Sequence, residues 1–176
     1  MKGLLILDIQ NDFTSAGAKF PVDPTQAEEI IANINILIAN SKKNDLLPIY
    51  IGNEYSQRDI LNIFRNFAAI KDSEGSKIDD RLDVVNNHYF PKHRGNAFTN
   101  KMLKEFLDRL AITELYIAGL YAEACVWATV RAAKKRGFIV TVLSDCIASK
   151  TGKKRKSLIE KYKNAGVAVL SGDMIL

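Results

Sequence analysis

Short apolar runs alternate with helical patterns along the whole chain, and this alternation limits the possible folds more than any other feature. Each run has the length and the content of apolar residues that are typical of a buried strand. Strands that alternate with helices predict a parallel sheet with helices on both faces. We therefore expect one α/β domain over residues 1–176, a three-layer αβα sandwich around a mostly parallel, six-stranded sheet. The expected strands are residues 2–8, 46–52, 88–90, 115–118, 138–143 and 167–170.

Caps and apolar stripes mark the helices between these strands. Asp23 and Pro24 form a strong helix start, and apolar residues then recur at helical spacing as far as Ile38. A second helix is expected over residues 60–67, where apolar residues cluster, and a third after Thr99. Residues 72–83 are polar and are expected to form a loop.

Charge and composition exclude several classes of protein. The net charge is +5, but the basic runs at residues 134–136 and 150–156 carry no interleaved aromatic residues that could stack on bases. We expect no nucleic-acid partner. No apolar run approaches the ~18 residues of a membrane span, and the N-terminus has no signal-peptide features. Two cysteines do not form a disulfide framework, so we expect a cytoplasmic protein.

The most informative local feature is the position of Cys125. An apolar strand at residues 115–118 is followed by Gly119 and then by a helical pattern that ends near Gly137. Cys125 therefore lies where a strand turns into a helix, a place where unpaired backbone N–H groups favour a thiolate. The simpler interpretation is a small buried cysteine that only packs at this junction.

A nucleophilic cysteine needs a base and a charge partner. Asp8 ends the first strand, and the carboxyl ends of parallel strands are where ligands bind in such sheets. A partly desolvated carboxylate there has a raised pKa and can accept a thiol proton. Lys92 or Arg94 could balance the charge. The histidines, His88 and His93, are weaker candidates for the base, and a G-x-G-x-x-G nucleotide motif is absent after the first strand.

Three sequence blocks, taken in order, resemble the isochorismatase-like cysteine hydrolase family, which includes nicotinamidases, carbamoyl-amide hydrolases and isochorismatases. The resemblance implies a Rossmann-like fold and a catalytic triad of Asp8, Lys92 and Cys125. It also implies a non-proline cis peptide between Leu120 and Tyr121, and an oxyanion hole made by the backbone N–H groups of Tyr121 and Cys125. The blocks are Leu7-Asp8-Ile9-Gln10-Asn11-Asp12-Phe13, Lys92 with Asn96-Ala97-Phe98, and Gly119-Leu120-Tyr121-Ala122-Glu123-Ala124-Cys125-Val126.

The chain departs from the family pattern in two ways. Ala122 replaces a threonine that commonly lies three residues before the cysteine. The second strand is followed by Asn53-Glu54-Tyr55, without the histidines of metal-dependent nicotinamidases. We therefore expect no metal and no other cofactor. Phe13 and Phe98 flank two of the blocks and are predicted to contact substrate, together with Asn53 or Glu54.

These features predict a metal-independent hydrolase that cleaves a C–N bond of a small amide or carbamoyl compound through a thioester. Two alternatives stay open: vinyl-ether cleavage of isochorismate, which does not need the thiol, and a non-catalytic domain used for binding or assembly. The expected partners are a small-molecule substrate and further copies of the chain, since relatives are usually dimers or larger. No membrane partner is expected.

Overall fold

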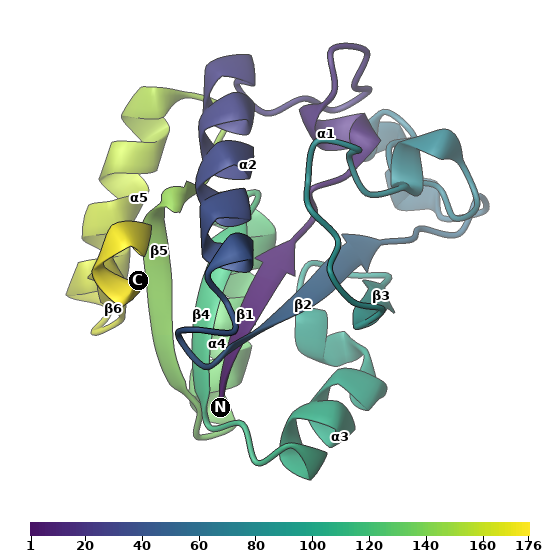
Figure 1. Ribbon diagram of the computed structural model, residues 1–176. Helices are drawn as coiled ribbons and strands as arrows, with labels where there is room; N and C mark the ends of the chain where they lie inside the picture. The colour runs from purple at the N-terminus through teal and green to yellow at the C-terminus, as the bar shows by residue number, and fades with distance from the viewer.

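The computed structural model describes all residues, 1–176, and its centre is one six-stranded sheet, which Figure 1 shows. Every neighbouring pair of strands is parallel, and the strand order is β3-β2-β1-β4-β5-β6. The α/β prediction is confirmed, and the sheet is parallel throughout. The strands are β1 Lys2–Leu7, β2 Leu46–Asn53, β3 Tyr89–Lys92, β4 Glu114–Gly119, β5 Ile139–Ile147 and β6 Ala168–Leu170.

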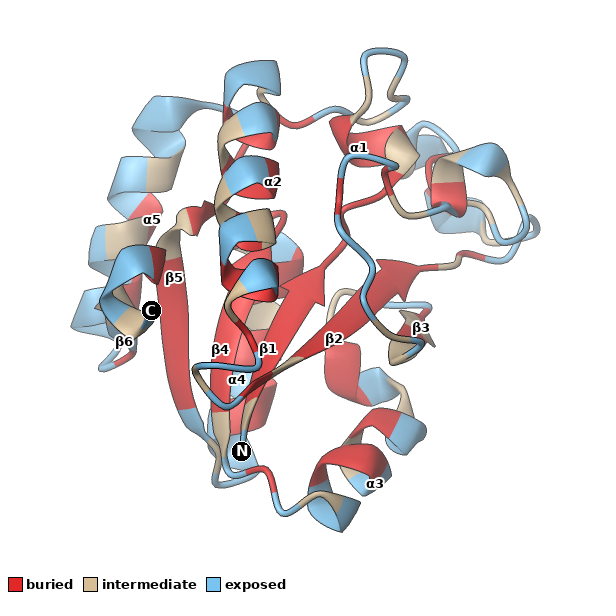
Figure 2. Cartoon of the chain, in the orientation of Figure 1, coloured by how far each residue is buried: buried red, intermediate tan, exposed pale blue.

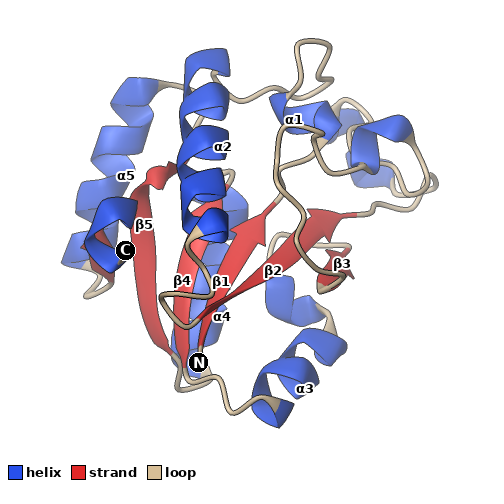
Figure 3. Cartoon of the chain, viewed as in Figure 1, coloured by secondary structure: helices blue, strands red, loops and turns tan.

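Helices cover both faces of the sheet (Figure 3). The side chain of Asp23 accepts from the Gln26 amide and caps the longest helix, as its sequence predicts. Short 3₁₀ helices occupy Ile60–Arg65, Glu74–Ser76, Ala97–Thr99 and Gly172–Ile175, and a π-helical turn spans Ala122–Val126. The α-helices are α1 Asn11–Thr14, α2 Pro24–Ala39, α3 Lys101–Arg109, α4 Trp127–Lys135 and α5 Gly152–Asn164.

Two expected helix boundaries were wrong. The segment after Asp59 is a 3₁₀ helix, Ile60–Arg65, and it cannot continue because Asn66 and Phe67 adopt a left-handed backbone, with φ 52° and 54°. The apolar residues Ile60, Ile63 and Phe64 are exposed, so this segment does not pack an apolar stripe against the core. The third helix begins after Asn100, whose side chain caps the Met102 amide, rather than after Thr99.

The apolar residues form one core on each face of the sheet, and Figure 2 shows the central strands β2, β1, β4 and β5 mostly buried. Side chains alternate along β1, so that Leu4 and Ile6 face α2 while Leu5 and Leu7 face α3, α4 and α5. None of the helices combines the length and the apolar character that a membrane span requires.

The strand order reverses direction at the centre of the sheet, between β1 and β4. Leu7 and Gly119 are register partners at the carboxyl ends of these two strands. Gly119 has φ +111°, and a Cβ atom there would lie 2.0 Å from the Leu7 carbonyl oxygen, so only glycine fits. The chain that follows each strand diverges here, which opens the kind of crevice in which α/β sheets bind ligands.

Candidate active site

Asp8, Lys92 and Cys125 meet at this central crevice. Asp8 directly follows β1, and Lys92 is the last residue of β3, two strands away. The Lys92 side chain is fully buried and extends across the end of β2. Its Nζ atom lies 2.9 Å from Asp8 Oδ2, 2.6 Å from Asn53 Oδ1 and 3.5 Å from Cys125 Sγ. The structure thus brings the three predicted triad side chains together around one ammonium group.

Cys125 is presented by an unusual turn after β4. The Leu120–Tyr121 peptide bond is cis, at the position that the resemblance implied. A π-helical turn follows, in which the Val126 amide donates to the Tyr121 carbonyl at 3.2 Å. The Tyr121 amide donates no hydrogen bond, so it is free to serve a ligand. The turn gives the sulfur a place in the crevice, where only 8% of the Cys125 residue is exposed.

Backbone contacts hold this turn although Ala122 lacks a polar side chain. The Ala122 amide donates to the Ala148 carbonyl at 2.8 Å, and the Tyr162 hydroxyl donates to the Ala122 carbonyl at 2.5 Å. The carboxylate of Glu123 pairs with Lys154 at 2.7 Å, from the first turn of α5. These contacts fix the turn from the α5 side, so the family threonine is not needed to anchor the Ala122 backbone.

Burial and mutual charge set the ionisation of the three groups. Burial raises the pKa of Asp8 above its usual value, although the Lys92 charge opposes this. For Lys92, burial acts to lower the pKa, but Asp8 and Cys125 outweigh it and raise the pKa above its usual value. Burial, followed by the Asp8 charge, raises the pKa of Cys125 to about 12. At neutral pH Lys92 is therefore an ammonium group, and Cys125 rests as a neutral thiol.

The side chain of Asn53 holds Lys92, because its amide oxygen accepts a hydrogen bond from the ammonium group; its contact with substrate stays a prediction. Gln10 in turn holds Asn53: its Oε1 accepts from the Asn53 amide at 2.8 Å, and its Nε2 donates to the Asn53 carbonyl at 2.9 Å. Gln10 is 1% exposed. The sequence assigned no role to Gln10 beyond its membership of the first family block, and its position two residues after Asp8 was the available signal.

The two phenylalanines lie in different surroundings. Phe13 packs edge-on against Tyr121, with ring centroids 6.1 Å apart, next to the turn that carries Cys125. Phe98 packs against Phe138, with centroids 5.6 Å apart, and Arg136 lies over its ring. Phe98 therefore packs in the core on the α4 face, and its contact with substrate stays a prediction.

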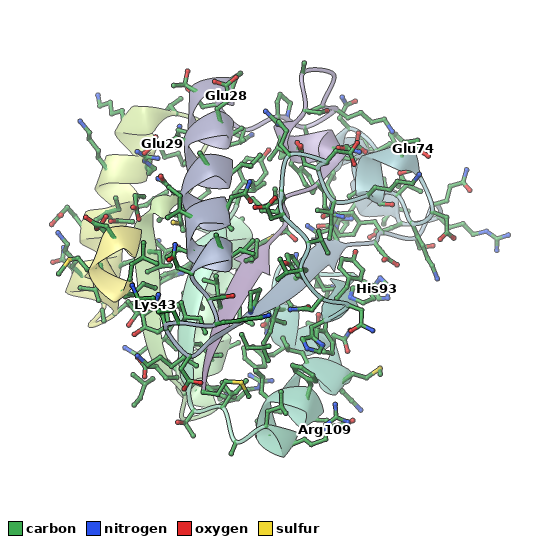
Figure 4. All side chains as sticks on the ribbon, in the orientation of Figure 1. Glu28, Glu29, Lys43, Glu74, His93 and Arg109 are labelled. Atoms are coloured by element: carbon green, nitrogen blue, oxygen red, sulfur yellow. The ribbon has the colours of Figure 1, made fainter.

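Polar residues form a rim outside the triad. A surface cavity of about 570 Å³ is lined by residues that include Glu54, Arg65, Lys71, His93 and Arg94. His93, labelled in Figure 4, is exposed, and its ring contacts the Glu54 carbonyl. Arg94 is also exposed, so Lys92 rather than Arg94 is the cation of the site. No three His, Cys, Asp or Glu side chains are grouped so that they could hold a metal ion.

Asp8, Lys92 and Cys125 meet where the strand order reverses, and a family comparison that covers almost the entire chain agrees with this arrangement. The sequence model of the Isochorismatase domain matches residues 2–174. The chain belongs to the isochorismatase family.

Relatives within and around this family include both named enzymes and a protein described as inactive. A "Probable inactive nicotinamidase" of Arabidopsis thaliana is 29% identical, and the alignment covers 93% of this chain and 89% of that protein. The crystal structure of an isochorismatase-like hydrolase from Alkaliphilus metalliredigens has a TM-score of 0.91 and 22% identity, with 99% and 97% of the two chains covered. Nicotinamidase PncA of Bacillus subtilis has a TM-score of 0.82 and 26% identity, with 97% and 99% covered.

Proposed function

We propose that this isochorismatase-family protein is a metal-independent cysteine hydrolase that cleaves the C–N bond of a small amide or carbamoyl compound. The observation that carries the proposal is the buried Lys92 ammonium, which contacts both the Asp8 carboxylate and the Cys125 sulfur. A core has no need of a buried cation between a carboxylate and a thiol, since burying charge is costly. The similarity to a nicotinamidase supports the choice of amide chemistry.

The mechanism follows from the resting charges. As Cys125 attacks the substrate carbonyl, its proton moves to Asp8, whose raised pKa makes it a suitable acceptor. Lys92 stabilises the sulfur as it loses the proton. The oxyanion is held by the Tyr121 and Cys125 amides, each worth ~3 kcal/mol in the transition state. Asp8 returns the proton to the leaving ammonia or amine, and then activates the water that hydrolyses the thioester.

Transfer of the proton to Asp8 also lowers the cost of forming the thiolate. The Asp8 charge is one of the two main causes of the high thiol pKa, and protonation removes that charge at the moment of attack. A neutral resting thiol is therefore compatible with nucleophilic catalysis, provided that proton transfer and attack are coupled. The two free cysteines, Cys125 and Cys146, fit a reducing compartment such as the cytoplasm.

The alternatives differ in what they require of Cys125. Vinyl-ether cleavage of isochorismate would use Asp8 as an acid without the thiol. A non-catalytic domain, as the description of the Arabidopsis relative suggests for that protein, would need none of the three groups in contact. The observed contacts favour the hydrolase, in which all three groups have a role.

Ammonia release from a panel of primary amides, ureas and carbamoyl compounds tests the proposal. Cys125→Ala should abolish turnover of whichever compound is cleaved, and mass spectrometry should detect an acyl adduct on Cys125 in the wild type. Cys146→Ala is the matched control, because Cys146 is fully buried within β5, outside the site, and its replacement should leave activity intact. Full activity of Cys125→Ala, or product from isochorismate alone, would rule out the thioester route.

A further inference from the structure

Gly95 lies beside the candidate nucleophile. It follows Lys92 by three residues, in the loop between β3 and the 3₁₀ helix Ala97–Thr99. A Cβ atom at Gly95 would lie 3.8 Å from Cys125 Sγ, 3.9 Å from Cys125 Cα and 3.9 Å from Ala128 Cβ. Gly95 and Ala128 are both half-buried, so this position is not sealed within the core. Gly95 therefore leaves open a space next to the sulfur that the side chain of any other residue would occupy.

The backbone does not require glycine at this position. The glycines with positive φ are Gly119, Gly137 and Gly166, and Gly95 is not one of them. At Gly119 a Cβ atom would lie 2.0 Å from the Leu7 carbonyl oxygen, whereas at Gly95 its nearest contacts would be at ordinary van der Waals distances. An alanine side chain would therefore fit the resting protein, so neither strain nor a clash explains the glycine.

The loop that carries Gly95 is held at both ends. At its start, the Lys92 carbonyl accepts a hydrogen bond from the Glu54 amide at 2.9 Å. At its end, the Ala97 amide donates to the Thr129 hydroxyl at 3.1 Å. Thr129 is fully buried on α4, the helix that follows the nucleophile turn. The fold therefore fixes the position of Gly95 relative to the sulfur.

The space next to the sulfur suits the acyl chain of a substrate. In the proposed mechanism the tetrahedral carbon carries the sulfur, the oxyanion, the leaving amine and the acyl chain. The oxyanion is held by the Tyr121 and Cys125 amides, and the amine faces Asp8, which protonates it. Neither Asp8 nor Lys92 supplies an atom nearest to the open position, so this side is left for the acyl chain. The nearest atoms are one sulfur and two carbons, so the space is apolar.

We propose that Gly95 is a specificity-determining residue, whose missing side chain makes room for an apolar acyl group of three or more carbons. With the carbonyl carbon counted as the first, the third acyl carbon lies three bonds from the sulfur in a thioester. It would therefore compete for the position that a Cβ atom at Gly95 would take. A bare carbamoyl group would leave the space empty, so the inference narrows the substrate class to amides of apolar carboxylic acids. It rests on the proposed function, since it places a thioester on Cys125.

Nitrophenyl esters test this without knowledge of the natural substrate, because the leaving group is constant and only the acyl chain varies. The sulfur of Cys125 bonds to the acyl carbon, the bond from that carbon to the nitrophenolate oxygen breaks, and the thiol proton passes to Asp8. Acetate, propionate and isobutyrate esters have no, one and two carbons at the third position. Values of kcat/KM for nitrophenolate release would be measured with the wild type, Gly95→Ala and Gly17→Ala, after the rate of Cys125→Ala is subtracted. Gly17→Ala is the matched control, because a Cβ atom at Gly17 would have no neighbour within 4 Å.

Gly95→Ala should change kcat/KM for the acetate by less than about 2-fold and lower it for the isobutyrate by about 10- to 100-fold, the cost of one overlapping methyl group. The propionate should lie between them, and Gly17→Ala should change none of the three. Iodoacetamide should label Cys125 in Gly95→Ala at the wild-type rate, because the thiol itself is unaltered. Equal losses for all three esters, or no loss, would overturn the role of Gly95 while leaving the hydrolase proposal in place. Nitrophenolate release that is no faster in the wild type than in Cys125→Ala would overturn both.

Discussion

Replacing Asp8 with asparagine should raise the rate at which Cys125 is alkylated and lower the rate of amide turnover. Asp8 Oδ2 and Cys125 Sγ both contact Lys92 Nζ, at 2.9 and 3.5 Å, so they are at most about 6 Å apart. At an effective dielectric of ~20, one charge at ~6 Å is worth about 3 kcal/mol, or a change of about two in pKa. Asp8→Asn should therefore lower the pKa of Cys125 from about 12 to roughly 10.

The change in the alkylation rate of Cys125 follows from this change in pKa. At pH 8 the thiolate fraction should rise ~100-fold, since it follows the pKa directly. A less basic thiolate is a weaker nucleophile, with a Brønsted coefficient of ~0.4–0.5, and this offsets about 10-fold. Iodoacetamide should therefore label Cys125 about 10-fold faster in Asp8→Asn than in the wild type. Amide turnover should fall by about 10²- to 10⁴-fold, because the general base is lost.

The assay is the rate of carboxamidomethylation of the Cys125 peptide by mass spectrometry, beside ammonia release. Loss of its partner leaves Lys92 buried and unpaired, which should cost about 3–5 kcal/mol of stability. Cys146, which is fully buried, serves as an internal control, because it becomes labelled only if the variant unfolds. Asp108→Asn, on the exposed face of α3, is the matched variant and should change neither rate. Slower or unchanged labelling of Cys125, or retained turnover, would refute the charge assignment.

Three further predictions concern parts of the molecule around the site. Gln10→Ala should lose about 2–4 kcal/mol in urea unfolding, and with it amidase activity, because both backbone groups of Asn53 lose their partners. Burial acts to raise the pKa of Asp79, but hydrogen bonds led by Arg81 lower it to about 2. This folded-state pKa is below the unfolded value, so Asp79 contributes about 1 kcal/mol of stability above pH ~4. This contribution should be lost as the pH falls toward 2. Asp79→Asn should abolish that pH dependence. We propose that the homo-oligomer expected from the family resemblance forms through the exposed apolar residues of the 3₁₀ helix Ile60–Arg65, where Phe64 is 79% exposed. Phe64→Asp should then yield monomers by light scattering, without loss of helix content by circular dichroism.

Local sequence patterns predicted the layered α/β fold and two of the three residues of the proposed triad. Strand length, apolar content and helix caps are properties of neighbouring residues, so the run after Lys2 and the helix after Asp23 could be assigned directly. Cys125 was found from its place between a strand and a helix, and Asp8 from its place at a strand end. The family resemblance then selected Lys92 over Arg94 and located the cis peptide.

The tertiary structure alone decided how these residues meet. Lys92 reaches Asp8 only because β3 lies two strands from β1, and strand order is not encoded in any local period. The same order brings the amide oxygen of Asn53 to the Lys92 ammonium group, a contact that the sequence did not predict. Side-chain direction and burial depend on contacts between residues far apart in the chain. The sequence could therefore identify the candidate reactive groups, but only the packed sheet showed which of them contact the buried Lys92 ammonium group.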